Sequence, residues 1–131
     1  MMPLLKEIRD AVSGHVAALP VPYRTRDGEP TFQSLRDTEY TPPGEMSFPT
    51  GLDPFMCTRY EIADFATEAH ALGVDYLGLC CGAGPHHIRS LAEALGRTPP
   101  ASQYSPDMSK HAYFGTDESL QAENVEFARD L

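Results

Sequence analysis

The sequence has 131 residues, which is the length of one domain or part of one, with 41% hydrophobic and 22% charged residues. This composition is typical of a soluble globular protein and excludes a disordered tail. Nineteen acidic and ten basic residues give a formal net charge of −9. The acidic balance argues against nucleic-acid binding and against docking on an anionic membrane, because few cations are available to neutralise phosphates.

Apolar residues at helical spacing predict a first helix over residues 4–12. Its apolar face would contain Leu4, Leu5, Ile8, Ala11 and Val12. The short apolar run 16–21 then predicts a buried strand of the parallel type, with Pro20 at its exit. Residues 24–54 contain scattered proline, glycine and charge, which predicts a long irregular loop.

The second half is more regular. Thr58 and Glu61 form a T-x-x-E capping box, which predicts a helix that ends at Gly73. Residues 74–79 follow as a predicted strand of about six residues. The buried face of the helix would contain Ile62, Phe65, Ala66, Ala69 and Leu72.

A third helix is predicted to begin at Pro85 and to end before Gly96. Its apolar face would contain Ile88, Leu91, Ala92 and Leu95. A short acidic helix over roughly residues 118–129 is predicted in the tail.

This alternation of helices and strands predicts an α/β fold with parallel pairing. Two parallel strands cannot bury both of their faces by themselves, so the elements look like two consecutive units of a larger barrel or doubly wound sheet. The unpaired edges of such strands also predict self-association.

The segment Gly78-Leu79-Cys80-Cys81-Gly82 lies at the carboxyl end of a predicted strand, where parallel α/β folds place their active sites. Two thiolates there would supply half of a tetrahedral zinc site. The spacing alone leaves two other interpretations open, namely buried or inert thiols and a redox-active pair. Three cysteines, two of them adjacent, exclude a disulfide scaffold and predict a reduced, cytoplasmic setting.

Other residues near the predicted strand ends have a functional and a structural interpretation. His86 and His87 would be further metal ligands or, more simply, polar residues of a surface helix. Cys57 would be a packing cysteine or a ligand. Residues that follow the first strand would line a site or anchor a loop: Tyr23, Arg24 and Thr25.

Several motifs resemble the homocysteine S-methyltransferase family, most closely its betaine–homocysteine methyltransferase branch. In that branch a strand ends in Gly-Gly-Cys-Cys-Gly and a Pro-x-His-Ile-Arg helix follows; this chain has Leu79 in place of the second glycine. The matching segments are CTRYEI at 57–62, GVDYLGLCCG at 73–82, PHHIR at 85–89, LPVPYRT at 19–25, FP-x-GLDP at 48–54 and PDMSK at 106–110.

The resemblance implies the C-terminal portion, about the last two β/α units, of a (β/α)₈ TIM barrel with Zn²⁺ at its carboxyl face. Residues 1–96 would be a partial homocysteine-binding barrel domain and residues 97–131 a C-terminal extension. Cys80 and Cys81 would hold the metal and would not be nucleophiles. The implied reaction transfers a methyl group from betaine or a similar onium donor to homocysteine and gives methionine.

The family's third zinc-binding cysteine lies on an earlier strand, and Cys57 does not match it. The resemblance therefore predicts a truncated chain that is inactive in isolation. The alternative is a non-catalytic barrel fragment that acts as a small zinc-binding or partner-binding protein.

Overall fold

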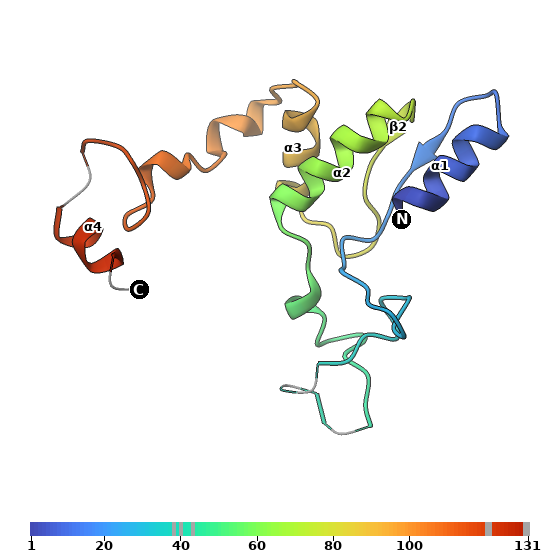
Figure 1. Cartoon of the computed structure of the whole chain (residues 1–131), viewed down its shortest axis with the longest axis horizontal. Helices are drawn as coiled ribbons and strands as arrows, with labels where there is room; N and C mark the ends of the chain where they lie inside the picture. Colours follow the sequence, from blue (N-terminus) through green and yellow to red (C-terminus); the bar gives the residue numbers. More distant parts are fainter. Residues whose placement is uncertain (38, 40, 43, 120–121, 130–131) are drawn as a thin grey trace. The chain divides into compact units, whose positions relative to one another are not determined.

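A computed structural model of the protein describes residues 1–37, 39, 41–42, 44–119 and 122–129. The chain divides into two compact units, Met1–Pro99 and Pro100–Leu131 (Figure 1). The first unit contains α1 (Met2–Ala11), β1 (Ala17–Ala18), the 3₁₀ turn η1 (Asp53–Phe55), α2 (Arg59–Ala71), β2 (Tyr76–Leu77) and α3 (Pro85–Ala94). The second contains the 3₁₀ segments η2 (Pro100–Tyr104) and η3 (Met108–Lys110) and the helix α4 (Ala122–Ala128).

The two strands pair in parallel, as the sequence predicts, with Ala17 opposite Tyr76 and Ala18 opposite Leu77. Backbone hydrogen bonds continue the pairing, because Cys80 N–H still donates to the Pro20 carbonyl at 2.8 Å. Between this bond and the bond from the Gly78 N–H to the Ala18 carbonyl, the register calls for a donation from Pro20, which has no N–H. The regular strands are therefore shorter than the predicted runs 16–21 and 74–79.

Helix α2 begins at the predicted capping box. The Glu61 N–H donates to Thr58 Oγ1 at 3.3 Å, and the Thr58 N–H donates to Glu61 Oε2 at 2.8 Å. The helix gives way to a turn at Gly73, whose φ of +83° is a conformation that favours glycine. The prediction for this helix is confirmed at both ends.

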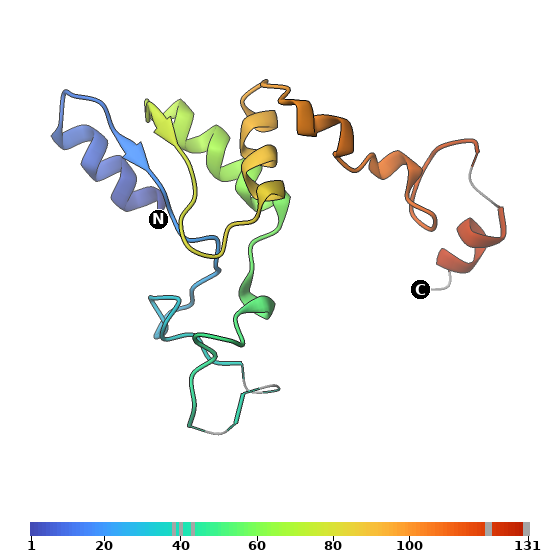
Figure 2. The same cartoon turned by 180° about the vertical axis from the view of Figure 1, so that it is seen from behind.

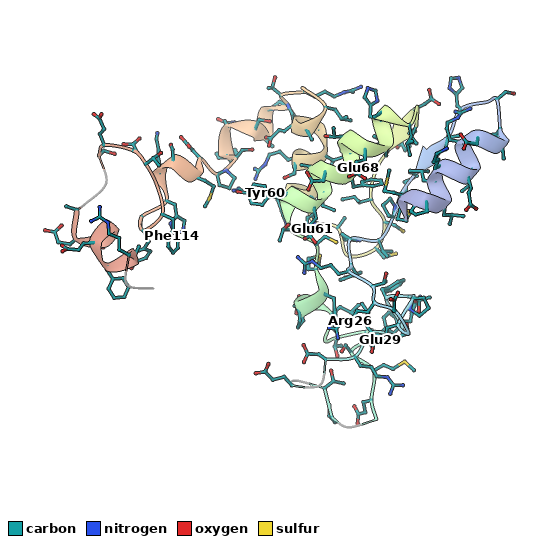
Figure 3. All side chains as sticks on the ribbon, viewed as in Figure 1. Arg26, Glu29, Tyr60, Glu61, Glu68 and Phe114 are labelled. Atoms are coloured by element: carbon teal, nitrogen blue, oxygen red, sulfur yellow. The ribbon has the colours of Figure 1, made fainter. Side chains whose placement is uncertain are left out.

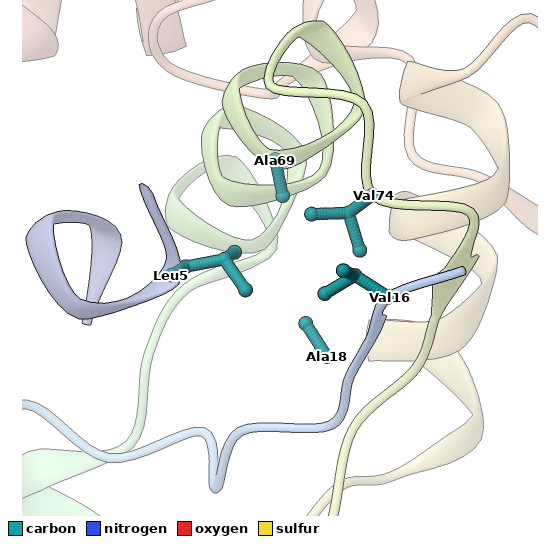
Figure 4. Packing of buried hydrophobic residues seen from close by; sticks show 5 residues of the cluster. All are labelled: Leu5, Val16, Ala18, Ala69 and Val74. Atoms are coloured by element: carbon teal, nitrogen blue, oxygen red, sulfur yellow. The ribbon is translucent and has the colours of Figure 1, made fainter. Parts of the chain in front are cut away.

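The core of the first unit lies around α2, which is seen between α1 and α3 from both sides (Figures 1 and 2). One buried cluster joins α1, the strands and the end of α2 (Figure 4). Its members are Leu5, Val16, Ala18, Ala69 and Val74. A second cluster of Ile62, Ala66 and Leu91 joins α2 to α3. Side chains of the apolar face predicted for α2 thus pack against α1 and the strands in one cluster and against α3 in the other.

Two predicted apolar faces differ from the structure. In α1 only Leu5 is buried, whereas Leu4, Ile8 and Val12 remain between 43% and 58% exposed. In α3 the buried side chains are His87 and Leu91, and Ile88 is 44% exposed. The inward position of His87 follows from two hydrogen bonds that its ring makes with backbone groups.

The long loop after β1 is irregular, as predicted, but it has a small core of its own. Leu35, Leu52 and Phe55 are buried there, and Tyr23 and Phe32 pack against them. The Ser47 hydroxyl accepts a hydrogen bond from the Asp37 N–H at 2.8 Å. Buried apolar contacts therefore order this loop without regular secondary structure.

The second unit contains only short helical segments. Its last helix, α4, covers seven residues, Ala122–Ala128, within the range 118–129 predicted for an acidic helix. Residues 120 and 121 of that range lie outside the described residues. Across the described part of the chain, no helix combines the length and apolar character that crossing a membrane requires.

Candidate metal site at the Cys-Cys-Gly turn

The adjacent cysteines lie in a tight turn that directly follows β2. The Ala83 N–H donates to the Cys80 carbonyl at 3.2 Å, which closes a four-residue turn. Gly82 occupies its third position with a φ of +92°, a requirement of the type II turn that glycine meets without strain. The glycine after the cysteines is therefore a geometric necessity of the turn.

Tyr23 packs directly over this turn from the other strand's exit. A Cβ atom added to Gly82 would collide with the Tyr23 hydroxyl and would lie 2.6 and 2.8 Å from two ring carbons. The phenol thus occupies the space that only a glycine leaves free. The structure brings Tyr23 to the site, as expected for a residue at the carboxyl edge of the sheet.

The two thiols are exposed and close to each other. Cys80 Sγ and Cys81 Sγ lie 3.4 Å apart, and both residues are exposed. Two thiolates on one tetrahedral zinc ion, with Zn–S bonds of about 2.3 Å, would be about 3.8 Å apart. The pair therefore fits two positions of a zinc coordination shell after a small opening. The interpretation as buried thiols is wrong for these residues.

The thiols influence each other's ionisation. The backbone N–H of Cys81, followed by the Cys81 thiol, holds the pKa of the Cys80 thiol below its usual value. The hydrogen bond and then the charge of the Cys80 sulfur raise the pKa of Cys81. The pair thus loses one proton easily and the second with difficulty. A cation between the sulfurs would remove the repulsion that opposes the second ionisation.

The two neighbouring histidines have different environments. His86 is exposed, whereas His87 is only 2% exposed. Its Nδ1 accepts from the Gly84 N–H at 3.0 Å, and its Nε2 lies 3.1 Å from the Cys57 carbonyl oxygen. Neither nitrogen of His87 is free to bind a metal. The interpretation of His87 as a surface residue is wrong, because these bonds turn it inward.

Cys57 is a packing cysteine. Its side chain is half-buried against the cluster formed by Ile62, Ala66 and Leu91. Burial, and then the Glu61 carboxylate, raise the pKa of this thiol, which disfavours a metal-binding thiolate. Within the described ranges, no group of three or more His, Cys, Asp or Glu side chains is arranged to hold a metal.

Arg24 is also placed at this edge, but it is engaged in an ion pair. Its Nε and one terminal nitrogen each lie 2.6 Å from an oxygen of Glu61. Glu61 lies at the start of α2 and is labelled in Figure 3. The Arg24 guanidinium, and then the Thr58 N–H, lower the pKa of Glu61 to about 2. The sequence predicts Arg24 at a strand exit and Glu61 in a capping box. No spacing rule predicts a contact between these two residues, which are 37 positions apart.

A shallow cavity of about 420 Å³ opens beside the exit of β1. Tyr23, Thr25 and Phe32 are among the residues that line it. The Tyr23 and Phe32 rings are stacked, with centroids 5.8 Å apart. Thr25 therefore lines a cavity, and its role in a site stays a prediction.

Comparison with known proteins finds relatives of this chain among the homocysteine S-methyltransferases. The chain is 38% identical over 120 residues to betaine–homocysteine S-methyltransferase 1 of Mus musculus, covering 86% of this chain and 26% of the relative. It is 38% identical over 122 residues to an S-methylmethionine–homocysteine S-methyltransferase of Rattus norvegicus, covering 88% of this chain and 29% of the relative. The chain is a betaine–homocysteine methyltransferase-like segment.

A shorter stretch is more similar. Over 73 residues, which are 53% of this chain and 16% of the relative, identity to betaine–homocysteine S-methyltransferase 1 of Rattus norvegicus reaches 47%. The chain thus spans only about a quarter of the length of the curated relatives that it matches. No protein-family model matches the chain.

Proposed function

We propose that this chain contributes the paired-thiolate half of a zinc site in a homocysteine S-methyltransferase. The reaction would transfer a methyl group from an onium donor to the sulfur of homocysteine. The relatives' names include both betaine and S-methylmethionine as donors, so the proposal covers donors of this class. The two exposed sulfurs 3.4 Å apart at the carboxyl edge of a parallel strand pair carry the proposal.

The order of elements supports a barrel origin for this site. Strands β1 and β2 are parallel and neighbouring, and α2 lies between them in the sequence. This is a β/α/β unit with a further helix, α3, as found in the repeating units of a (β/α)₈ barrel. We therefore propose that residues 1–96 are barrel units with their site at the carboxyl edge.

The proposed roles of the chain's residues are limited to holding and orienting. Cys80 and Cys81 would bind zinc as thiolates, and zinc, when bound, makes a thiol that joins it more acidic. The backbone N–H of Cys81 already favours the Cys80 thiolate. Gly82 and Tyr23 would hold the turn in the shape that keeps both sulfurs on one side.

Zinc binding by serine variants tests the metal part of the proposal. Cys80→Ser and Cys81→Ser should each lose most of the Zn²⁺ affinity, measured by competition with a chromophoric chelator, because a neutral hydroxyl replaces a thiolate. Cys57→Ser is the matched control and should retain wild-type affinity, since that thiol packs in the core. Equal losses in all three variants, or none in the first two, would contradict a site at the turn.

Methyl transfer tests the catalytic part. The described residues provide two thiolate ligands, so we expect the isolated 131-residue protein to bind Zn²⁺ weakly and to form no methionine from homocysteine. Betaine and S-methylmethionine should be compared as donors, with methionine measured by mass spectrometry. Steady methionine production by this protein alone would overturn the expectation that a third ligand must come from elsewhere.

A second candidate function, zinc binding without catalysis, is favoured by the same two-ligand arrangement. Homocysteine distinguishes the two candidates. In the Co²⁺-loaded protein, homocysteine should change the thiolate-to-metal absorption if its sulfur joins the metal, whereas methionine should not. An absorption spectrum that is unaffected by homocysteine would support the non-catalytic candidate.

A further inference from the structure

The Cys-Cys-Gly turn is held by a closed ring of contacts that passes through one buried imidazole. The Cys57 N–H donates to the Pro22 carbonyl at 2.8 Å, which ties the entry of α2 to the exit of β1. The Cys57 carbonyl in turn lies 3.1 Å from His87 Nε2. His87 Nδ1 accepts from the Gly84 N–H, two residues beyond Gly82.

Tyr23 closes the ring, because it follows Pro22 in the chain and its phenol lies against Gly82. The turn is therefore fixed at three places. Cys80 is bonded to the first strand through the Pro20 carbonyl, Gly82 is covered by the phenol, and Gly84 is bonded to His87. Of these three contacts, only the one at Gly84 depends on a single side chain's hydrogen bonds.

The partners of His87 also fix its protonation state. A backbone N–H can only donate and a carbonyl oxygen can only accept. The Gly84 N–H therefore requires an unprotonated Nδ1, and the Cys57 carbonyl requires a proton on Nε2. His87 is thus a neutral imidazole with its proton on Nε2, fully occupied by structural bonds.

We infer that His87 is a positioning residue for the Cys80 and Cys81 thiols, acting through Gly84, and not a metal ligand. The inference rests on the proposed metal site at the turn. Residues that orient ligands from behind contribute strongly to metal affinity, and their loss typically weakens it about 10-fold to 100-fold.

Two substitutions at this position separate hydrogen bonding from space filling. His87→Leu fills the site without bonding either backbone group, and Zn²⁺ affinity should fall at least about 10-fold. His87→Gln places an amide acceptor and donor at the third helical position, where glutamine reaches back to the residue that begins the helix. It should recover most of the affinity. His70→Leu, at an exposed histidine of α2, is the control and should change nothing.

A trivalent arsenical gives a readout that does not depend on zinc. Phenylarsine oxide must bond to both sulfurs, so it should close this ring of arsenic and two sulfurs more slowly in His87→Leu. Iodoacetamide should alkylate the exposed thiols of the variant at the wild-type rate. If the wild-type protein fails to bind Zn²⁺, the proposed metal site is wrong, yet the arsenical still tests the positioning role. Equal closure rates in the wild type and in folded His87→Leu would overturn it, as would a glutamine variant as impaired as the leucine variant.

Nitrogen NMR of the wild-type protein covers the case in which His87→Leu does not fold. The ring of His87 should show the tautomer with the proton on Nε2, and its two nitrogen shifts should stay unchanged when Zn²⁺ is added. A charged ring, or a nitrogen that shifts as a metal ligand does, would overturn the inference without any variant.

Discussion

The first unit has two contrasting regions. At the carboxyl edge of β1 and β2, the turn that carries the thiols is fixed at three places, by the exit of the first strand and by α3. On the outer side of α1 and beside β2, apolar side chains such as Ile8 and Tyr76 are exposed. Contacts within this chain thus fix the structure of the edge, whereas the apolar side chains of the outer faces are exposed to solvent.

A comparison within α3 should produce the largest effect. Both Leu91 and Ile88 line a groove beside β2, but Leu91 is 6% exposed and joins α3 to α2, whereas Ile88 is 44% exposed. Leu91→Ala should lower the free energy of unfolding by about 3 kcal/mol, because it leaves a cavity. Ile88→Ala should cost about 1 kcal/mol or less. Denaturant unfolding measures both, and equal costs would mean that the groove is covered in solution.

Glycine substitutions test how tightly the edge is fixed. Gly82 and Gly28 both have positive φ, but only Gly82 has side-chain atoms where a Cβ would lie. Gly28→Ala should cost about 1–2 kcal/mol, for the backbone conformation alone. Gly82→Ala should cost about 2–3 kcal/mol, because the Tyr23 phenol must also move.

The double variant Gly82→Ala/Tyr23→Ala isolates the contact with the phenol. If the phenol causes the extra cost, alanine at position 82 should be no more harmful in this background than alanine at position 28. The cost is again measured by denaturant unfolding. An unchanged cost of Gly82→Ala after removal of the phenol would show that the turn is limited by its backbone only.

Much of this edge could be predicted from the sequence. The capping box at Thr58 and the stop at Gly73 follow from rules that act over a few residues, and the parallel pairing follows from the order of helices and strands. The structure contains all three. The position of the adjacent cysteines in a turn at a strand end follows from the same rules, whereas the spacing left open whether their thiols are buried. Whether the edge belongs to a (β/α)₈ barrel, and whether Zn²⁺ binds there, remain predictions.

The remaining features depend on contacts between distant segments. His87 lies inward because its ring meets the Cys57 carbonyl, 30 residues away, and helical spacing alone cannot reveal this partner. The apolar side chains of α1 have the spacing of a buried face, yet only Leu5 is covered. Periodicity indicates which residues share a face but not what covers it.

The ion pair between Arg24 and Glu61 links the edge to the start of α2, and pH tests its contribution. The folded pKa of Glu61 is about 2, below its usual value of 4.5, so its contribution is complete above about pH 4.5 and is lost as the pH falls through about 2. Both side chains are 42% exposed, so solvent screening limits the effect. Glu61→Gln should cost about 1 kcal/mol at pH 7, and the difference from wild type should shrink in acid.

Glu68→Gln, at an exposed carboxylate of the same helix (Figure 3), is the control. Its difference in unfolding free energy from wild type should be small at both pH values. Urea unfolding at pH 7 and at pH 3 measures both variants. A difference between wild type and Glu61→Gln that grew in acid would reverse the sign expected from the lowered pKa, and would place the stabilising role of Glu61 in its protonated form.

Substitutions on the outer face of α1 should change the stability of the protein least and its self-association most. Leu4 and Ile8 lie on one helical face and are 58% and 43% exposed. Leu4→Lys and Ile8→Lys should therefore change the free energy of unfolding by no more than about 0.5 kcal/mol. If the exposed faces drive self-association, the same variants should shift sedimentation towards the monomer, because lysine on this face opposes close packing. Leu5→Ala, on the covered side of the helix, should instead reduce stability. If wild type and the lysine variants sediment alike as monomers, the exposed face does not associate, and the contrast between the two regions is one of exposure alone.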